Sequence, residues 1–207
     1  ATLSNNILGK LLKKNITNTF NAISCDGDTS TNDMVSLFST NESRNPIIKD
    51  FKDSKLKNFR QSLKDVLLNL AKRVAADGEG ASKFISITCK NTKTVQDAKN
   101  VCFSIANSPL VKTAIAGQDP NWGRIAMAIG KSNAEIDGKK LSINIGPFKV
   151  LVKGNLFQGY DEKLVREYMQ SELIHITVDI GIGKKDFTAY TMDLTKKYID
   201  INADYRS

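Results

Sequence analysis

The stretch Asp26-Gly27-Asp28-Thr29-Ser30-Thr31-Asn32-Asp33 is the segment around which the chain is organised. It lies between an apolar run that ends at Cys25 and another that begins at Met34. A tight turn needs about two such residues, so a continuous polar and glycine run of this length exceeds what a hairpin requires. Short polar side chains can bond to backbone groups and fix the neighbouring strands. Composition alone also fits a long surface loop, but we favour a hydrogen-bonding platform.

The apolar runs on either side of this octet predict two paired strands, at 20–25 and 34–38. Before them, Ser4 or Asn5 can cap a first helix with one apolar stripe. After them, 39–46 reads as a loop, and the longest helix is expected at about 51–76. The apolar residues of that helix recur at spacings of three and four: Leu56, Phe59, Leu63, Leu67, Leu70 and Val74.

The long helix is followed by Asp77-Gly78-Glu79-Gly80. We expect Gly78 to be a left-handed helix stop and Gly80 to allow a close approach of the backbone to another segment. Glu79 is then a carboxylate at a helix C-terminus, where the helix dipole disfavours negative charge unless a cation offsets it. A solvated loop glutamate and a ligand-binding carboxylate both fit this position.

The remainder predicts strands and helices in a mixed α/β arrangement. Thr94 with Asp97 forms a capping box, and Ser108-Pro109 ends the helix that the box begins. The last hairpin is expected at Gly181-Ile182-Gly183, and a short strand at 198–201. Expected strands are 84–90, 140–145, 148–152, 173–180 and 187–192, with a helix at 161–170.

Composition restricts the class of protein. The chain has 207 residues, 41% hydrophobic and 25% charged, which is ordinary for a soluble globular protein. No apolar run approaches the roughly 20 residues that cross a bilayer. His175, the single histidine, lies in a strand-like run, which argues against histidine-based metal or triad chemistry. We read the three cysteines as buried reduced thiols of a cytosolic protein.

Four ordered motifs identify a resemblance. The motifs are the octet at 26–33, Asp77-Gly78-Glu79-Gly80-Ala81-Ser82-Lys83, Ser108-Pro109-Leu110-Val111-Lys112-Thr113-Ala114, and Asp119-Pro120-Asn121-Trp122-Gly123-Arg124. With the polar tail at 202–207, they closely resemble the β chain of the ornithine acetyltransferase (glutamate N-acetyltransferase) family of arginine biosynthesis. The similarity runs essentially from Ala1 to Ser207.

The resemblance implies a precursor that cuts itself before a threonine, which becomes the N-terminal nucleophile. This threonine takes the acetyl group from N2-acetylornithine, ornithine leaves, and glutamate then accepts the acetyl group. The implied partner is an α chain from the same precursor, in an α2β2 or higher oligomer. No cofactor, metal, nucleic acid or membrane is implied, and whether acetyl-CoA is a second acetyl donor stays open.

The resemblance also implies the site residues. Aligning on the octet puts the family's threonine upstream of Ala1, so no catalytic residue is expected within residues 1–207. Thr2 superficially imitates the cut site, but it leads straight into a helix cap. Three positions match substrate contacts of the family: Glu79, Asn202 and Ser207. Glu79 can pair with a substrate ammonium, Asn202 offers a donor and an acceptor, and Ser207 offers a hydroxyl and a terminal carboxylate.

The implied fold is α/β: a layered α-β-β-α domain shared with the α chain, to which residues 1–82 contribute, and a smaller sheet-and-helix domain at 83–201. The tail at 202–207 would return to the active site, with Asp26 and Asn32 as polar support. A related self-cleaving N-terminal-nucleophile aminopeptidase is the first alternative. A basic nucleic-acid-binding module is the second, because the net charge is +8. The lysines at 49–73 alternate with aspartates, however, which favours a solvated helix face.

Overall fold

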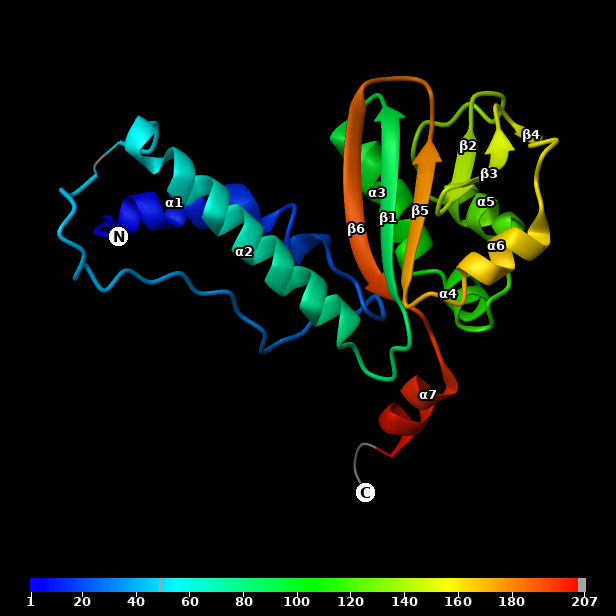
Figure 1. Cartoon of the computed structure of the whole chain (residues 1–207), viewed down its shortest axis with the longest axis horizontal. Coiled ribbons are helices and arrows are strands. Elements are labelled where there is room, and N and C mark those ends of the chain that lie inside the picture. Colours follow the sequence, from blue (N-terminus) through cyan, green and yellow to red (C-terminus); the bar gives the residue numbers. More distant parts are fainter. Residues whose placement is uncertain (49, 205–207) are drawn as a thin grey trace. The chain divides into compact units, whose positions relative to one another are not determined.

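The structure is a computed structural model, and it describes residues 1–48 and 50–204. Figure 1 shows the helices and strands coloured along the chain. The chain forms two compact units. The first consists of Ala1–Ala22 and Thr29–Lys72, and the second of Ile23–Asp28 and Arg73–Ser207. The domain division drawn from the sequence, at residues 82 and 201, stays a prediction.

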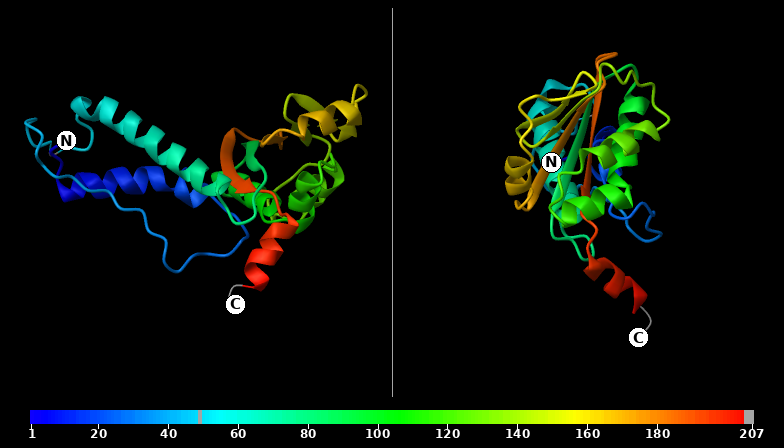
Figure 2. Two further views of the ribbon diagram at one scale, coloured as in Figure 1. Left: turned by 60° about the horizontal axis from the view of Figure 1, so that its bottom comes forward. Right: turned by 90° about the vertical axis from the view of Figure 1, so that its right-hand side faces the viewer.

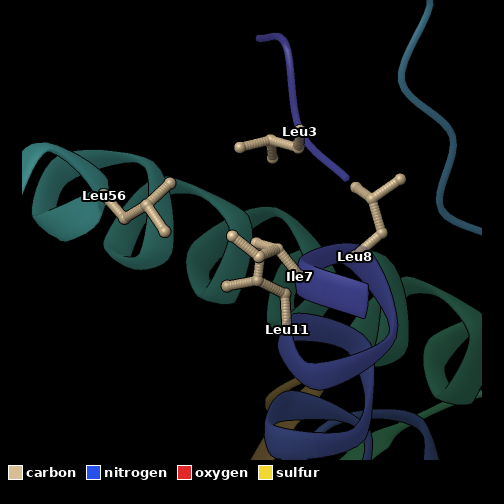
Figure 3. Close-up of a cluster of buried hydrophobic side chains, with 5 residues drawn as sticks. All are labelled: Leu3, Ile7, Leu8, Leu11 and Leu56. Atoms are coloured by element: carbon tan, nitrogen blue, oxygen red, sulfur yellow. The ribbon is translucent and has the colours of Figure 1, made fainter. Parts of the chain in front are cut away.

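The first unit is built on two helices. Helix α1 spans Asn5–Ile16 with Ser4 at its N-cap position, as predicted. Helix α2 spans Lys57–Ala76 and follows a short 3₁₀ turn, η2, at Ser54–Leu56. A cluster of buried aliphatic side chains joins these elements: Leu3, Ile7, Leu8, Leu11 and Leu56. In Figure 3, Ile7 and Leu11 extend from α1 toward the helix that begins after Leu56.

The apolar stripe predicted for the long helix is buried only in part. Leu56 and Leu67 are buried, together with the small residue Ala71. Leu70 and Val74 were expected on the same stripe, but they are 44% and 49% exposed. The spacing rule identified a helix correctly, and the outer apolar residues form an uncovered face.

The two strands predicted beside the octet are wrong. Phe20–Ala22 is a 3₁₀ turn, η1, and Ile23 makes a single parallel bridge to Tyr190. No strand is assigned to residues 34–38, where Met34 is 82% and Phe38 85% exposed. A run of β-type residues becomes a strand only when another strand pairs with it. Among the described residues, 34–38 have no such neighbour.

The second unit contains one six-stranded mixed sheet in the order β4-β3-β2-β5-β1-β6. Strands β1 and β5 are parallel, and the other neighbours are antiparallel. Strand β1 alternates as predicted, with Ile85, Ile87 and Cys89 buried on one face. The strands are β1 Phe84–Thr92, β2 Ser142–Ile145, β3 Phe148–Val152, β4 Asn155–Leu156, β5 Leu173–Asp179 and β6 Lys185–Met192.

The predicted last hairpin is wrong, because β1 lies between β5 and β6. The connecting segment instead passes over the end of β1. The backbone N–H groups of Ile182 and Gly183 both donate to the carbonyl of Asn91. A side chain at Gly183 would lie 2.0 Å from the carbonyl oxygen of Thr92, so the crossing requires a glycine.

Five helices accompany the sheet: α3 Val95–Ala106, α4 Pro109–Ala116, α5 Trp122–Gly130, α6 Glu162–Tyr168 and α7 Lys196–Ala203. Helix α3 begins with the predicted capping box and packs on β1 and β6. Helices α3, α4 and α5 lie on one face of the sheet (Figure 2). The strand predicted at 198–201 is wrong, because these residues belong to α7.

The predicted fold class, α/β with a mixed sheet, is confirmed. Within residues 1–48 and 50–204, no helix is long and apolar enough to cross a membrane. The elements that matter most for the site lie at one end of the sheet. These are the loop between α2 and β1, and the segment that leaves β6 and leads to α7.

Candidate functional site

The loop that carries Glu79 is formed by close packing around two glycines. Helix α2 ends at Ala76, and the N–H of Ala81 donates to the carbonyl of Gly78. A side chain at Gly78 would lie 2.2 Å from the sulfur of Met192. Gly78 therefore serves close packing, and the prediction of a left-handed helix stop at this position is wrong, since its φ is not positive.

Gly80 makes the close approach that the sequence predicted. Its φ is +69°, and a side chain there would lie 2.5 Å from the backbone nitrogen of Tyr198. The carbonyl of Gly80 also accepts a 2.6 Å hydrogen bond from the hydroxyl of Thr195. The segment that approaches Gly80 is thus the beginning of helix α7.

Glu79 and Asn202 are in direct contact. The side-chain amide of Asn202 donates a 2.8 Å hydrogen bond to Oε2 of Glu79 and a 3.0 Å bond to the carbonyl of Tyr198. Both side chains are exposed. The Glu79 carboxylate at this helix end therefore accepts a hydrogen bond from a neutral N–H donor.

A second side-chain contact connects α7 to the octet. The phenol of Tyr198 donates a 3.1 Å hydrogen bond to Oδ2 of Asp26. Slight burial and this hydrogen bond raise the pKa of the Tyr198 phenol. No residue of α7 within Lys196–Ala203 is buried. Polar contacts, rather than apolar packing, therefore hold this helix.

A buried cation supports the segment that leads to Asp26. Lys112 lies on α4 and is only 3% exposed. Its ammonium donates to the carbonyl of Cys25, and at 3.1 Å to the hydroxyl of Thr191. Burial lowers the pKa of the Lys112 ammonium, and the nearby groups of Cys25, Asp26 and Asp193 oppose that shift. Lys112 thus joins Ile23–Asp28 to the sheet.

Two of the three predicted substrate contacts, Glu79 and Asn202, come together in the structure. Ser207 lies outside the described residues. Asn32 makes local turn contacts with Ser30 and Thr31. The hydroxyl of Thr2 is engaged, because it donates a 2.7 Å hydrogen bond to the carbonyl of Ser43.

Sequence reasoning missed three residues that connect the segments around Glu79 and Asn202: Lys112, Asp193 and Tyr198. Lys112 lies inside one of the four motifs. A lysine beside the apolar residues Val111, Ala114 and Ile115 indicates a buried charge. Tyr198 was hidden by its assignment to a strand, and Asp193 gave no signal as a lone aspartate beyond a strand. Among the described residues, no group of three His, Cys, Asp or Glu side chains could hold a metal ion.

Comparison with known proteins places the chain in a family. A profile described as "ArgJ family" matches residues 1–207. The "Arginine biosynthesis bifunctional protein ArgJ" of Mesorhizobium japonicum is 45% identical over 97% of this chain and 49% of that protein. The protein of the same name from Bradyrhizobium diazoefficiens is 47% identical over 97% of this chain and 49% of its own length.

A solved structure agrees with these relatives. The crystal structure titled arginine biosynthesis bifunctional protein argJ, from Bacillus halodurans, has a TM-score of 0.94 and 37% identity. The match covers 99% of this chain and 96% of that chain. The chain spans about half the length of the curated relatives that it matches. Its whole length and fold agree with one family, and the chain belongs to the ArgJ family.

Proposed function

We propose that residues 1–207 form the β part of an acetyltransferase that moves an acetyl group from N2-acetylornithine to glutamate in arginine biosynthesis. Family membership supports this proposal, since the relatives are named as arginine biosynthesis proteins. The observation that carries it for the site is the hydrogen bond between Asn202 and Glu79. These residues, 123 positions apart, are the two matched substrate contacts that lie within the described chain.

The two substrates need opposite charges at one place in the site. N2-acetylornithine presents a side-chain ammonium, whereas glutamate presents a side-chain carboxylate. The Glu79 carboxylate can accept a charge-assisted hydrogen bond from the ammonium. The Asn202 amide can donate to the carboxylate of glutamate. A paired carboxylate and amide therefore suits a site that receives both substrates in turn.

The reaction proceeds in two balanced steps. A threonine hydroxyl outside residues 1–207 attacks the acetyl carbonyl, an acetyl-threonine ester forms, the amide C–N bond breaks, and ornithine leaves with the hydroxyl proton. The amine of glutamate then attacks the ester, N-acetylglutamate forms, and the threonine regains its proton. Glu79, Asn202 and Ser207 bind and orient the substrates in this scheme.

The proposed partner is an α part from the same self-cleaved precursor, in an α2β2 or higher assembly. The chain's span of about half of its relatives supports this proposal. The apolar side chains of Met34 and Phe38 support it as well, because large apolar groups at 82% and 85% exposure suit a covering segment. The cytoplasm is the proposed location, in keeping with three free cysteines.

The test is an assay of the complete gene product for formation of N-acetylglutamate from N2-acetylornithine and glutamate. Glu79→Ala should reduce kcat/KM by about 100-fold, because removing one partner of a hydrogen-bonded charge pair that the bound substrate covers costs about 2–5 kcal/mol. Glu167→Ala, at an exposed glutamate of α6, is the matched control and should act like the wild type. Full activity of Glu79→Ala would refute the site. Hydrolysis of amino-terminal peptides without transfer would instead support the aminopeptidase alternative.

A further inference from the structure

Asp193 is a fully buried carboxylate just beyond the end of β6. Its Oδ1 accepts hydrogen bonds from the backbone N–H groups of Ser82 at 2.8 Å and Lys83 at 2.9 Å. Its Oδ2 accepts a 2.5 Å bond from the hydroxyl of Ser82. Its own N–H donates to the carbonyl of Lys83 at 3.2 Å. One side chain therefore holds two consecutive residues of the loop before β1.

These contacts join the two segments that carry the proposed substrate contacts. Ser82 lies three residues after Glu79, on the loop between α2 and β1. Asp193 itself begins the segment that continues through Thr195 to Asn202. The hydroxyl of Thr195 makes the second tie between the same two segments, by its bond to the carbonyl of Gly80. The Glu79–Asn202 bond is the third and outermost tie, and it is exposed.

The innermost and the outermost of these ties differ in how readily water can replace them. Water competes for an exposed amide–carboxylate bond, so that bond alone does not fix the two groups. Asp193 itself is fully buried, its contact with the N–H of Lys83 is buried and its contacts with Ser82 are partly buried. Removing the carboxylate would leave two backbone N–H groups without this acceptor. The contacts of Asp193 therefore determine how the two segments lie, and the Glu79–Asn202 hydrogen bond follows from that placement.

We infer that Asp193 is a positioning residue that sets the placement of Glu79 relative to Asn202, and thereby the affinity for both amino-acid substrates. This inference rests on the proposed function of that pair. Asp193 does not touch the substrate, because it is buried and its oxygens are occupied by Ser82 and Lys83. Asp193 affects the binding of the substrate and of the transition state equally. Its loss should therefore raise KM and leave kcat nearly unchanged.

The test compares Asp193→Ala with Asp193→Asn in the complete gene product. Asparagine keeps one oxygen for the two backbone N–H groups, and its amide can donate to the hydroxyl oxygen of Ser82. Asp193→Ala should raise KM for N2-acetylornithine and for glutamate about tenfold, with kcat within threefold of the wild type. Asp193→Asn should restore both KM values to within threefold. A folded Asp193→Ala enzyme with wild-type KM values would overturn the inference.

A second pair of variants decides the question if Asp193→Ala does not fold. Ser82 is exposed, so its substitution leaves no buried cavity. Ser82→Ala removes the donor to Oδ2 of Asp193, and Ser82→Thr keeps the hydroxyl. Ser82→Ala should raise both KM values about threefold and Ser82→Thr should not. Equal KM values for the two variants would then overturn the inference.

Failure of this inference differs from failure of the proposed function. If Glu79→Ala keeps full transfer activity, the pair does not bind substrate, and the proposed function of the site fails. If Glu79→Ala loses transfer while Asp193→Ala keeps its KM values, only the positioning role fails. Asp186→Asn, at an exposed aspartate of β6, is the control for replacing an aspartate by an asparagine. It should leave kcat and both KM values unchanged.

Discussion

The side-chain amide of Asn202 donates a 2.8 Å hydrogen bond to the carboxylate of Glu79, from the last helix to the loop before the first strand. The two residues are 123 positions apart in the sequence. The contact depends on Gly80, whose backbone lies against the first turn of α7, and on the buried carboxylate of Asp193.

Asn202→Asp should separate the two half-reactions. The new carboxylate would stand beside that of Glu79, and it would repel the side-chain carboxylate of glutamate while attracting the ammonium of N2-acetylornithine. We expect kcat/KM for glutamate to fall about 100-fold and that for N2-acetylornithine to change less than tenfold. Steady-state kinetics with each substrate varied in turn measures both values. Equal losses in both half-reactions would contradict the assigned contact, and Asn155→Asp on β4 is the control.

Gly80→Ala should destabilise the protein and separate the pair. The φ of +69° disfavours any side chain by about 1–2 kcal/mol, and the added carbon would lie 2.5 Å from the nitrogen of Tyr198. We therefore expect a loss of at least about 2 kcal/mol in the free energy of unfolding. Gly138→Ala is the matched control, since nothing lies within 4 Å of a side chain there. Equal denaturation midpoints for the two variants would contradict this packing.

The sequence predicted those parts of the fold whose signals are local. Helix α1, the alternation of β1 and the capping box of α3 each depend on residues within a few positions of one another. The strands expected at 20–25 and 34–38 failed because pairing is not local. The segment 198–201 failed because four alternating residues fit an exposed helix as well as a strand.

The candidate site was predicted in a different way. Glu79 and Asn202 were named from a resemblance of motifs, and no spacing in the chain indicates that they touch. Residues that support the site gave still less signal. Asp193 acts through two backbone N–H groups, and a pattern of side chains does not record which backbone groups need an acceptor. Only the folded arrangement of the loop and β6 reveals that need.

Tyr198→Phe should loosen helix α7 without unfolding the rest. The helix has no buried residue within Lys196–Ala203, and the phenol supplies its bond to Asp26. Loss of one hydrogen bond costs about 0.5–1.5 kcal/mol, so local opening should become about 2–13 times more frequent. Hydrogen exchange of the α7 amides measures this change. Tyr160→Phe is the control, and unchanged exchange in α7 would show that the Asp26 contact contributes nothing.

Alkaline pH should destabilise the protein through its buried thiols. Burial raises the pKa of the Cys102 thiol to about 12, and burial also raises that of Cys89. Above pH of about 9 the unfolded chain loses these protons while the folded chain keeps them. The stability that the thiols contribute is therefore complete below that pH and declines as pH rises toward 12, by about 1.4 kcal/mol per pH unit for each thiol.

The variant Cys102→Ala isolates this effect. Between pH 9 and 10.5 its free energy of unfolding should fall less steeply than that of the wild type. The slopes should differ by about 1.4 kcal/mol per pH unit, which corresponds to one proton. Lysine and tyrosine titration is common to both proteins and cancels in the comparison of slopes. Between pH 6 and 8 the two slopes should agree, whatever the cavity left by the smaller side chain costs. Denaturant titrations at fixed pH provide the values. Parallel slopes above pH 9 would mean that Cys102 ionises as readily in the folded chain as in the unfolded one.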